Sequence, residues 1–175
     1  METDEVLMNR YCEGDTKALE VLFDRHARGV HAFLARMVRD GALAEDLLQS
    51  TFLSVVRSAD RYQRGSPVMP WLLTIAANAA RDSLRRAKLN PEVLAEVSQP
   101  DSAHEPAMSD PAMRRRIEAA FAELPVQQRE AVVMHKVNGL SFEQIADALD
   151  ITSTAARIRA HRGYERLREL LGDLA

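Results

Sequence analysis

The segment that most constrains the fold of this chain lies at residues 140–170, where two amphipathic helices are separated by a turn of only a few residues. Ser141, followed three residues later by Gln144, predicts a reciprocal capping box for the first helix. Ala146 is small enough to let the second helix pack across the first at a steep angle, and Asp150 tolerates a left-handed turn. Such a helix-turn-helix is suited to placing its second helix in a DNA groove.

The second helix of this pair carries basic side chains that suit nucleic acid. Such groups can bind phosphate or pair with guanine in the major groove. They are Arg157, Arg159, His161, Arg162, Arg166 and Arg168. The alternative is a helical hairpin with a solvated basic face, and we favour DNA binding over it.

Charge is unevenly distributed along the chain, although the formal net charge is only −3. Residues 89–112 hold five acidic residues and no Lys or Arg, whereas residues 1–88 and 113–175 are each close to neutral. We therefore expect weak non-specific attraction to nucleic acid, so that tight DNA binding would need a partner. The acidic segment mixes Pro, Ser and Ala without periodicity, which predicts a linker.

Composition limits the class of protein further. A chain of 175 residues with 46% hydrophobic and only 5% aromatic residues suits one or two helix-rich domains. No apolar run approaches the roughly 20 residues of a membrane span, and the first residues are acidic and polar, so we expect a cytoplasmic protein without membrane insertion. The lone Cys12 cannot form an internal disulfide, and we assign it no function.

Apolar residues at steps of three and four predict a first long helix over residues 16–39 and a second over residues 43–58. The residues that the second helix would bury are Leu43, Leu47, Leu48, Thr51, Phe52, Val55 and Val56. Asp46, Gln49 and Leu53 are left on a shared outward face. An apolar residue on that face predicts a docking surface.

A loop over residues 61–70 should precede a third helix from Trp71 to about Ala87, because Gly65, Pro67 and Pro70 interrupt helical structure. One surface of this helix combines an aromatic ring, an amide and arginines, which suits unpaired nucleic acid through stacking and phosphate binding. Its members are Trp71, Thr74, Asn78, Arg81, Asp82 and Arg85. The alternative is that the Trp belongs to the core and the arginines are merely solvated.

Helical periodicity resumes at Met113, breaks at Pro125 and stops at Asn138-Gly139, directly before the helix-turn-helix. We therefore predict an all-α protein with two small helical domains, residues 1–88 and 113–175, whose separate cores are joined by a flexible linker over residues 89–112. Limited proteolysis should cut this linker between about Asn90 and Pro111.

No catalytic or metal-binding arrangement is evident in the sequence. His26 and His31 are five residues apart, off a single helical face, and the other histidines have no partner at ligand spacing. Phosphate-cradling glycines and nucleophile motifs are also missing. We expect no enzyme, metal or cofactor. Two binding functions stay open, namely a promoter-specificity subunit of a polymerase and a free-standing helix-turn-helix regulator with an unrelated sensor domain.

The order of these parts resembles the bacterial sigma factors of the extracytoplasmic-function class over nearly the whole chain. The core of region 2 in that family is similar to AEDLLQSTFLSVVRSADRYQRGS, residues 44–66. Its region 2.4 is similar to WLLTIAANAARDSLRR, residues 71–86, and its region 4 to LPVQQREAVVMHKVNGLSFEQIADALDI, residues 124–151. A short linker stands where larger sigma factors have an extra domain.

The resemblance implies roles for particular residues. Docking on the clamp helices of the largest polymerase subunit would use Asp46, Gln49 and Leu53. Melting and reading the minus-10 promoter element would use Arg61, Tyr62, Arg64, Trp71, Asn78, Arg81, Asp82, Arg85 and Arg86. Region 4 would bind the polymerase flap and read the minus-35 element as duplex through Ser153, Thr154, Arg157, Ile158, His161 and Arg162.

The resemblance also implies an anti-sigma factor that covers the docking face and the recognition helix until a stress or other signal releases it. The acidic linker would thread toward the polymerase active site, either mimicking the charge of the transcript or serving as a solvated spacer. The chain departs from the family at Val68 and Met69 in the loop, and at Asp150, where glycine is commoner. Ala156 and Ala160 replace larger aliphatic residues, which predicts a recognition helix that packs closer or looser than usual.

Overall fold

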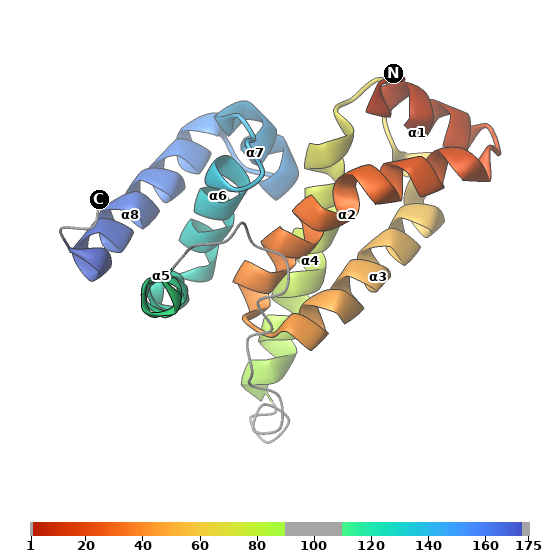
Figure 1. The fold of residues 1–175 in the computed structure, drawn as a ribbon. Coiled ribbons are helices and arrows are strands. Elements are labelled where there is room, and N and C mark those ends of the chain that lie inside the picture. The colour runs from red at the N-terminus through yellow and green to blue at the C-terminus, as the bar shows by residue number, and fades with distance from the viewer. Residues whose placement is uncertain (1, 90–109, 173–175) are drawn as a thin grey trace.

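Every regular element that the structure describes is helical, and the helices form two bundles that pack side by side (Figure 1). The structure is a computed structural model and describes residues 2–89 and 110–172. Its elements are α1 (Asp4–Cys12), α2 (Thr16–Val38), α3 (Gly41–Ser58), the short 3-10 helix η1 (Ala59–Arg61), α4 (Val68–Leu89), α5 (Pro111–Glu123), α6 (Val126–Lys136), α7 (Phe142–Leu149) and α8 (Ser153–Leu171). The predicted all-α fold is confirmed.

Helices α2 and α3 begin at aspartate caps. The Asp15 side chain accepts a hydrogen bond from the Lys17 backbone N–H at 3.1 Å, and the Asp40 side chain accepts one from Leu43 N–H at 2.9 Å. Arg39 ends α2 in the left-handed conformation, with φ of 61°. The bounds of both helices agree with the predicted ones to within two residues.

Helix α1 is not predicted from the sequence, because a helix this short depends on tertiary contacts for its stability. Its buried residues are Leu7 and Met8, and the helix packs against α2. Asp4 in its first turn accepts a hydrogen bond from Arg25 at 2.8 Å and lies 2.8 Å from His26 Nε2, so two residues of α2 hold the start of α1.

Helix α4 begins at Val68, three residues before the predicted start at Trp71. Pro70 is tolerated because it lies in the first turn, where a missing N–H breaks no helical hydrogen bond. The helix is central, since it packs against α2 and α3 and also against α7 of the second bundle (Figure 1). It therefore buries side chains on more than one face; these are Val68, Pro70, Leu72, Leu73, Ala76, Ala77 and Ala80.

The turn between α7 and α8 has the predicted geometry. Ser141 Oγ accepts a hydrogen bond from Gln144 N–H at 3.2 Å, and the Gln144 side chain accepts one from Ser141 N–H at 2.9 Å, which confirms the capping box. Asp150 adopts the left-handed conformation, with φ of 53°, and Thr152 caps α8 by accepting from Ala155 N–H. The two helices of the pair thus stand in the arrangement expected of a helix-turn-helix.

The buried residues of the two bundles form one connected cluster, which includes Leu34 and Ala77 of the first bundle and Met134 and Ile145 of the second. This differs from the separate cores expected from the sequence, because α7 packs on α4 and α6 on α2. The acidic linker, with the predicted cleavage segment and the proposed transcript mimicry, lies almost wholly outside the described residues. No helix in the described ranges is both long and apolar enough to cross a membrane.

Candidate nucleic-acid and partner interfaces

The outer face of α4 brings together most of the residues expected to read a melted minus-10 strand. Asn78, Asp82, Arg85 and Arg86 are exposed, and Arg81 is half-buried beside them. These polar groups already bond to one another, because Arg81 Nη1 donates to Asn78 Oδ1 at 3.1 Å and Arg85 Nη2 donates to Asp82 Oδ1 at 3.0 Å. The result is a strip of one amide, one carboxylate and three guanidinium groups along α4, which we call the α4 strip.

Tyr62 and Trp71 pack against each other at the start of α4. Their ring centroids are 5.2 Å apart with an interplanar angle of 64°. Tyr62 is buried and its hydroxyl donates to the Ser66 carbonyl oxygen, whereas Trp71 is half-buried against the core. Burial, with the nearby acidic groups of Glu5 and Asp4, raises the Tyr62 pKa to about 12. Tyr62 therefore supports the loop and Trp71 here, and offers no free stacking face.

The loop before α4 leaves two arginines at the surface. Arg61 ends η1 and is exposed. Arg64 is also exposed and pairs with Glu13, with Nη1 and Oε1 2.9 Å apart. An exposed ion pair of this kind is worth little in water, so Arg64 can exchange its partner for a phosphate.

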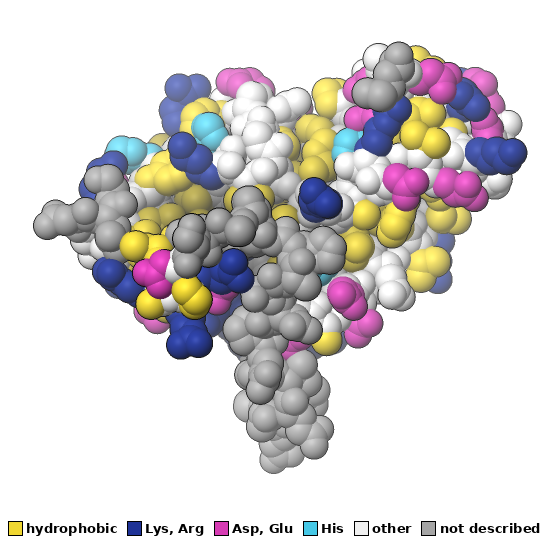
Figure 2. All heavy atoms as spheres, viewed as in Figure 1, with side chains coloured by type: hydrophobic (Ala, Val, Ile, Leu, Met, Phe, Trp, Pro, Cys, Tyr) yellow, Lys and Arg dark blue, Asp and Glu magenta, His cyan; other side chains and the backbone are white. Residues whose placement is uncertain are grey.

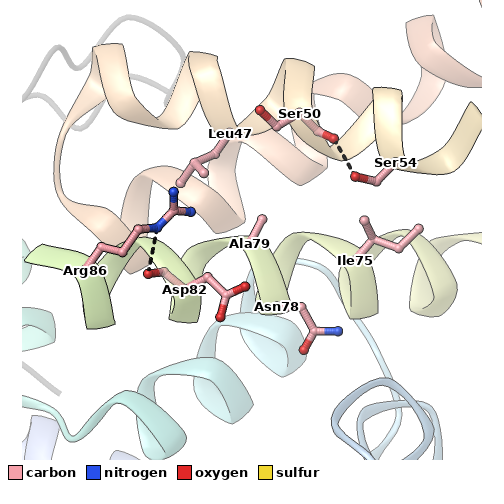
Figure 3. Close-up of a pocket in the computed structure, with 8 residues that line it drawn as sticks. All are labelled: Leu47, Ser50, Ser54, Ile75, Asn78, Ala79, Asp82 and Arg86. Carbon is pink, nitrogen blue, oxygen red and sulfur yellow. Dashed lines mark hydrogen bonds between the residues drawn. The ribbon is translucent and has the colours of Figure 1, made fainter. Parts of the chain in front are cut away.

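An open groove of about 360 Å³ runs between α3 and α4 and borders the α4 strip (Figure 3). The Arg86 side chain turns from α4 toward Leu47, and its Nε donates to the Asp82 carbonyl oxygen at 3.3 Å. The lining residues are Leu47, Ser50, Ser54, Ile75, Asn78, Ala79, Asp82 and Arg86. The two serines were not predicted; their position one helical turn apart on α3 is the signal that could have identified them.

The outward face of α3 carries the predicted docking residues. Asp46 and Gln49 are exposed, and Leu53 is 55% exposed. Val56 is 48% exposed, so its predicted burial is wrong; it lies one turn from Leu53 and extends the same apolar surface. Phe23 of α2 is also exposed and packs edge-on against Phe52 of α3, with ring centroids 4.7 Å apart. The apolar surface is therefore larger than the sequence indicated.

The predicted minus-35 residues lie along α8. Thr154, Arg157, Ile158, His161 and Arg162 are exposed. Ser153 is half-buried, and its hydroxyl donates to Glu143 at 3.2 Å. The Arg157 guanidinium lies 5.1 Å from the centre of the Phe142 ring, and His161 Nε2 lies 3.2 Å from Glu165. Helix α8 packs mainly on α5, α6 and α7 of its own bundle, and these five side chains remain exposed.

Small residues seat α8 closely on its bundle. Ala156, Ala160 and Gly163 are buried. A Cβ atom at Gly163 would lie 2.5 Å from Val132 Cγ2 and 3.3 Å from the Gln128 carbonyl oxygen, closer than normal packing permits. These contacts place α8 directly against α6, which holds both Gln128 and Val132.

On the face shown in Figure 2, Lys and Arg side chains recur over the second bundle, and acidic side chains gather near α1. Within residues 2–89 and 110–172, no cluster of three or more His, Cys, Asp or Glu side chains could hold a metal ion.

Comparisons with known proteins match both halves of the chain. The family model for Sigma-70 region 2 matches residues 22–89, and the family model for Sigma-70, region 4 matches residues 114–167. RNA polymerase sigma factor CarQ of Myxococcus xanthus is 55% identical over 171 residues, which cover 95% of this chain and 97% of CarQ. ECF RNA polymerase sigma factor SigM of Mycobacterium tuberculosis is 34% identical over 98% of this chain and 86% of its own length.

Two solved structures share the fold. CnrH, solved in complex with the cytosolic domain of CnrY, has a TM-score of 0.77 at 21% identity, covering 99% of this chain and 100% of CnrH. The sigma factor RpoE of Bartonella quintana, solved with the anti-sigma factor NepR, also has a TM-score of 0.77, at 24% identity, covering 91% of this chain and 99% of RpoE. With two sigma-70 regions in order, 55% identity to CarQ and 34% identity to the ECF factor SigM, the chain belongs to the ECF RNA polymerase sigma factors.

Proposed function

We propose that this chain directs RNA polymerase to promoters as a sigma factor and has no catalytic activity of its own. The observation that carries this proposal is the 55% identity to a named RNA polymerase sigma factor over 97% of that protein's length. A free-standing helix-turn-helix regulator would account for α7 and α8, but it would leave the region 2 match over residues 22–89 unexplained. A protein with this function acts in the cytoplasm.

The outward face of α3 is the proposed docking surface for the clamp helices of the largest polymerase subunit. Leu53 and Val56 supply exposed apolar surface that binding would remove from water. Asp46 and Gln49 supply polar groups at the edge of that surface. An exposed apolar centre with a polar rim is the usual composition of a protein interface.

The outer face of α4 is the proposed reader of the melted minus-10 strand. Arg85 and Arg86 can bind phosphates, while Asn78 and Asp82 can pair with the edges of splayed bases. Arg61 and Arg64 of the preceding loop would guide the strand onto this face.

Helix α8 is the proposed reader of the minus-35 duplex, and the flap of the polymerase is the proposed partner of its bundle. Arg157 and Arg162 can fork onto guanine or bind phosphate in the major groove, and Ile158 can contact a thymine methyl group. Ser153 and Thr154 lie at the amino end of α8, where a helix-turn-helix makes its base contacts.

An anti-sigma factor is the proposed regulator. Two proteins with this fold were solved in complex with a partner protein: CnrH with the cytosolic domain of CnrY, and RpoE with the anti-sigma factor NepR. The exposed apolar side chains of Leu53, Val56 and Ile158 would give such a partner hydrophobic anchors on both bundles. Its release would free the sigma factor by mass action.

Run-off transcription with purified core polymerase tests the proposed function. We expect the full chain to start transcription from a subset of genomic fragments when core enzyme is present, and to form no stable promoter complex without it. A chain that binds specific DNA alone and never supports initiation by core enzyme would be a free-standing regulator instead.

The docking surface has its own test. Leu53→Ala should weaken core binding roughly 5-fold, because truncating a central apolar anchor commonly costs about 1 kcal/mol. Glu45→Ala, at another exposed position on α3 outside the predicted docking set, is the matched control and should bind core like the native chain. Equal affinities for the two variants would remove Leu53 from the interface.

A further inference from the structure

Arg157 of the predicted minus-35 set lies over an aromatic ring of the preceding helix. Its guanidinium carbon is 5.1 Å from the centre of the ring of Phe142, the first residue of α7. A guanidinium over the face of a ring is attracted to it and loses freedom of movement. Unlike the bond of Arg85 to Asp82, a ring contact occupies no N–H donor, so Arg157 stays able to fork onto a guanine.

The Phe142 ring is itself held in place. It follows directly after Ser141, whose capping box with Gln144 fixes the backbone at the start of α7. The ring also packs edge-on against His135 of α6, with centroids 4.5 Å apart and an interplanar angle of 68°. Burial, with the charge of Lys136, lowers the pKa of His135, so its imidazole is uncharged near neutral pH and packs as an aromatic ring. Phe142 therefore offers Arg157 a fixed surface.

The same turn of α7 reaches a second predicted minus-35 residue. The Ser153 hydroxyl donates to Glu143 at 3.2 Å. Hydrogen bonds from its own backbone N–H, from Ser141 and from Ser153 lower the pKa of Glu143, and the charge of Arg157 adds to this effect. Because Glu143 is exposed, its attraction for Arg157 is weak, and the Phe142 ring supplies the main restraint.

Restraint before binding matters because an exposed arginine samples many rotamers. Fixing such a side chain in one rotamer on DNA opposes binding through lost conformational entropy. A side chain that is already ordered in the free protein loses less, so its contact with the base contributes more to affinity. The gain is local, since a forked guanidinium contacts the edge of one guanine.

We propose that Phe142 is a positioning residue for minus-35 recognition, whose ring orders Arg157 in the free protein and so increases discrimination at the base pair that Arg157 contacts. This inference rests on the proposed reading of the minus-35 duplex by α8. A ring that only filled space in the bundle would support the fold without selecting any base pair.

The first measurement uses the free, full-length chain and needs neither DNA nor polymerase. Relaxation of the arginine Nε–H groups in NMR spectra reports how far each guanidinium is ordered. We expect Arg157 to be more ordered than Arg162, and Phe142→Leu to lower the order parameter of Arg157 to about that of Arg162. Phe121→Leu, which removes another half-buried ring from the same bundle, is the matched control and should leave Arg157 ordered. Equal order of Arg157 in the native chain and in Phe142→Leu would overturn the inference.

The second measurement uses holoenzyme formed with purified core polymerase on a promoter identified by run-off transcription. Each base pair of the minus-35 element is changed in turn, and binding is measured by fluorescence anisotropy at fixed salt. Arg157→Ala identifies the base pair that Arg157 reads. We expect Phe142→Leu to weaken binding of the native promoter about 3-fold and to reduce discrimination at that base pair alone. In the Arg157→Ala background it should change binding by less than about 1.5-fold, and Phe142→Tyr, which keeps the ring, should bind like the native chain.

A loss of discrimination spread equally over every base pair, or the same effect of Phe142→Leu with and without Arg157, would show that the ring only supports the fold and would overturn the inference. A holoenzyme that never starts transcription would overturn the proposed function instead. The NMR measurement decides whether Phe142 orders Arg157 in either case.

Discussion

The two helices that we propose as DNA readers, α4 and α8, differ in how freely their arginines are available. On α8, Arg157 and Arg162 are exposed, and that helix packs mainly on α5, α6 and α7 of its own bundle. On α4, Arg81 is bound to Glu130 of the other bundle, and Arg85 and Arg86 bond to Asp82. The proposed duplex-reading surface on α8 therefore has exposed arginines, whereas the arginines of the proposed single-strand surface on α4 are partly bonded to other groups of the protein.

This difference follows the chemistry of the two targets. Duplex DNA presents its groove edges without rearrangement, so a rigid, open helix suffices. A melted strand exists only after base pairs have been broken, and a face that binds single strands at all times would capture unrelated nucleic acid. We expect the bonds of Arg81, Arg85 and Arg86 to Glu130 and Asp82 to limit that capture.

The largest expected effect concerns the close seating of α8. Gly163→Val would place branched carbons against Val132 and the Gln128 carbonyl oxygen, so we expect about 3 kcal/mol of lost stability in urea unfolding followed by circular dichroism. Gly29→Ala is the comparison, because its Cβ would meet mainly the flexible end of Met69, and it should cost much less. If the two substitutions cost the same free energy of unfolding, the close approach of Gly163 to Val132 and Gln128 does not determine how α8 is held in its bundle.

The next effect distinguishes the exposed arginines of α8 from the partly bonded arginines of α4. Arg157→Ala or Arg162→Ala should weaken binding to a minus-35 duplex by about 1–3 kcal/mol in fluorescence anisotropy at fixed salt. The loss should be the same in the native and Glu130→Gln backgrounds, because Arg157 and Arg162 are exposed on α8 and Glu130 pairs with Arg81 instead. Arg115→Ala, an exposed arginine on α5, supplies the control for non-specific charge.

Arg81 should behave in the opposite way. We expect Glu130→Gln to strengthen binding of the free chain to a single-stranded minus-10 oligonucleotide about 3-fold, because it releases Arg81. Adding Arg81→Ala should abolish that gain, whereas Arg81→Ala alone should change little in the native background. An equal loss on removing Arg81 in both backgrounds would mean that Glu130 does not restrain it.

Much of the local structure could be predicted because it is decided by residues close in sequence. The capping box of Ser141 and Gln144 and the left-handed turn at Asp150 involve neighbours only, and both are present. The exposure of Asp46, Gln49 and Leu53 follows from helical period and one buried side. Such features can be predicted without knowing which helices pack against one another.

The parts that could not be predicted depend on partners distant in the chain. Helix α1 packs on α2, and Glu130 of α6 is buried with Arg81 of α4 as its partner, 49 residues away in the sequence. In the sequence, Arg129 and Glu130 are indistinguishable from surface charges of an amphipathic helix. Tyr62 is buried under a loop whose path no periodicity specifies, and Val56 falls at the edge of a helix face, where small rotations decide exposure.

The smallest expected effect concerns α1, an element of the first bundle alone. Burial by itself would raise the Asp4 pKa, but the hydrogen bond from Arg25 and the charge and hydrogen bond of His26 outweigh it, so the pKa is lowered from 3.8. A carboxyl group whose pKa is lower in the folded state stabilises the fold fully at pH values above its unfolded-state pKa. This stabilisation is lost as the pH falls through the lower folded-state pKa.

Asp4→Asn should therefore lower the melting temperature by about 2 °C at neutral pH, with the gap to the native chain closing below about pH 4. Trp71, the single tryptophan, reports on the first bundle by fluorescence, and Asp24→Asn at an exposed position of α2 is the control. A gap that persists undiminished at pH 3 would show that Asp4 supports α1 through shape rather than charge.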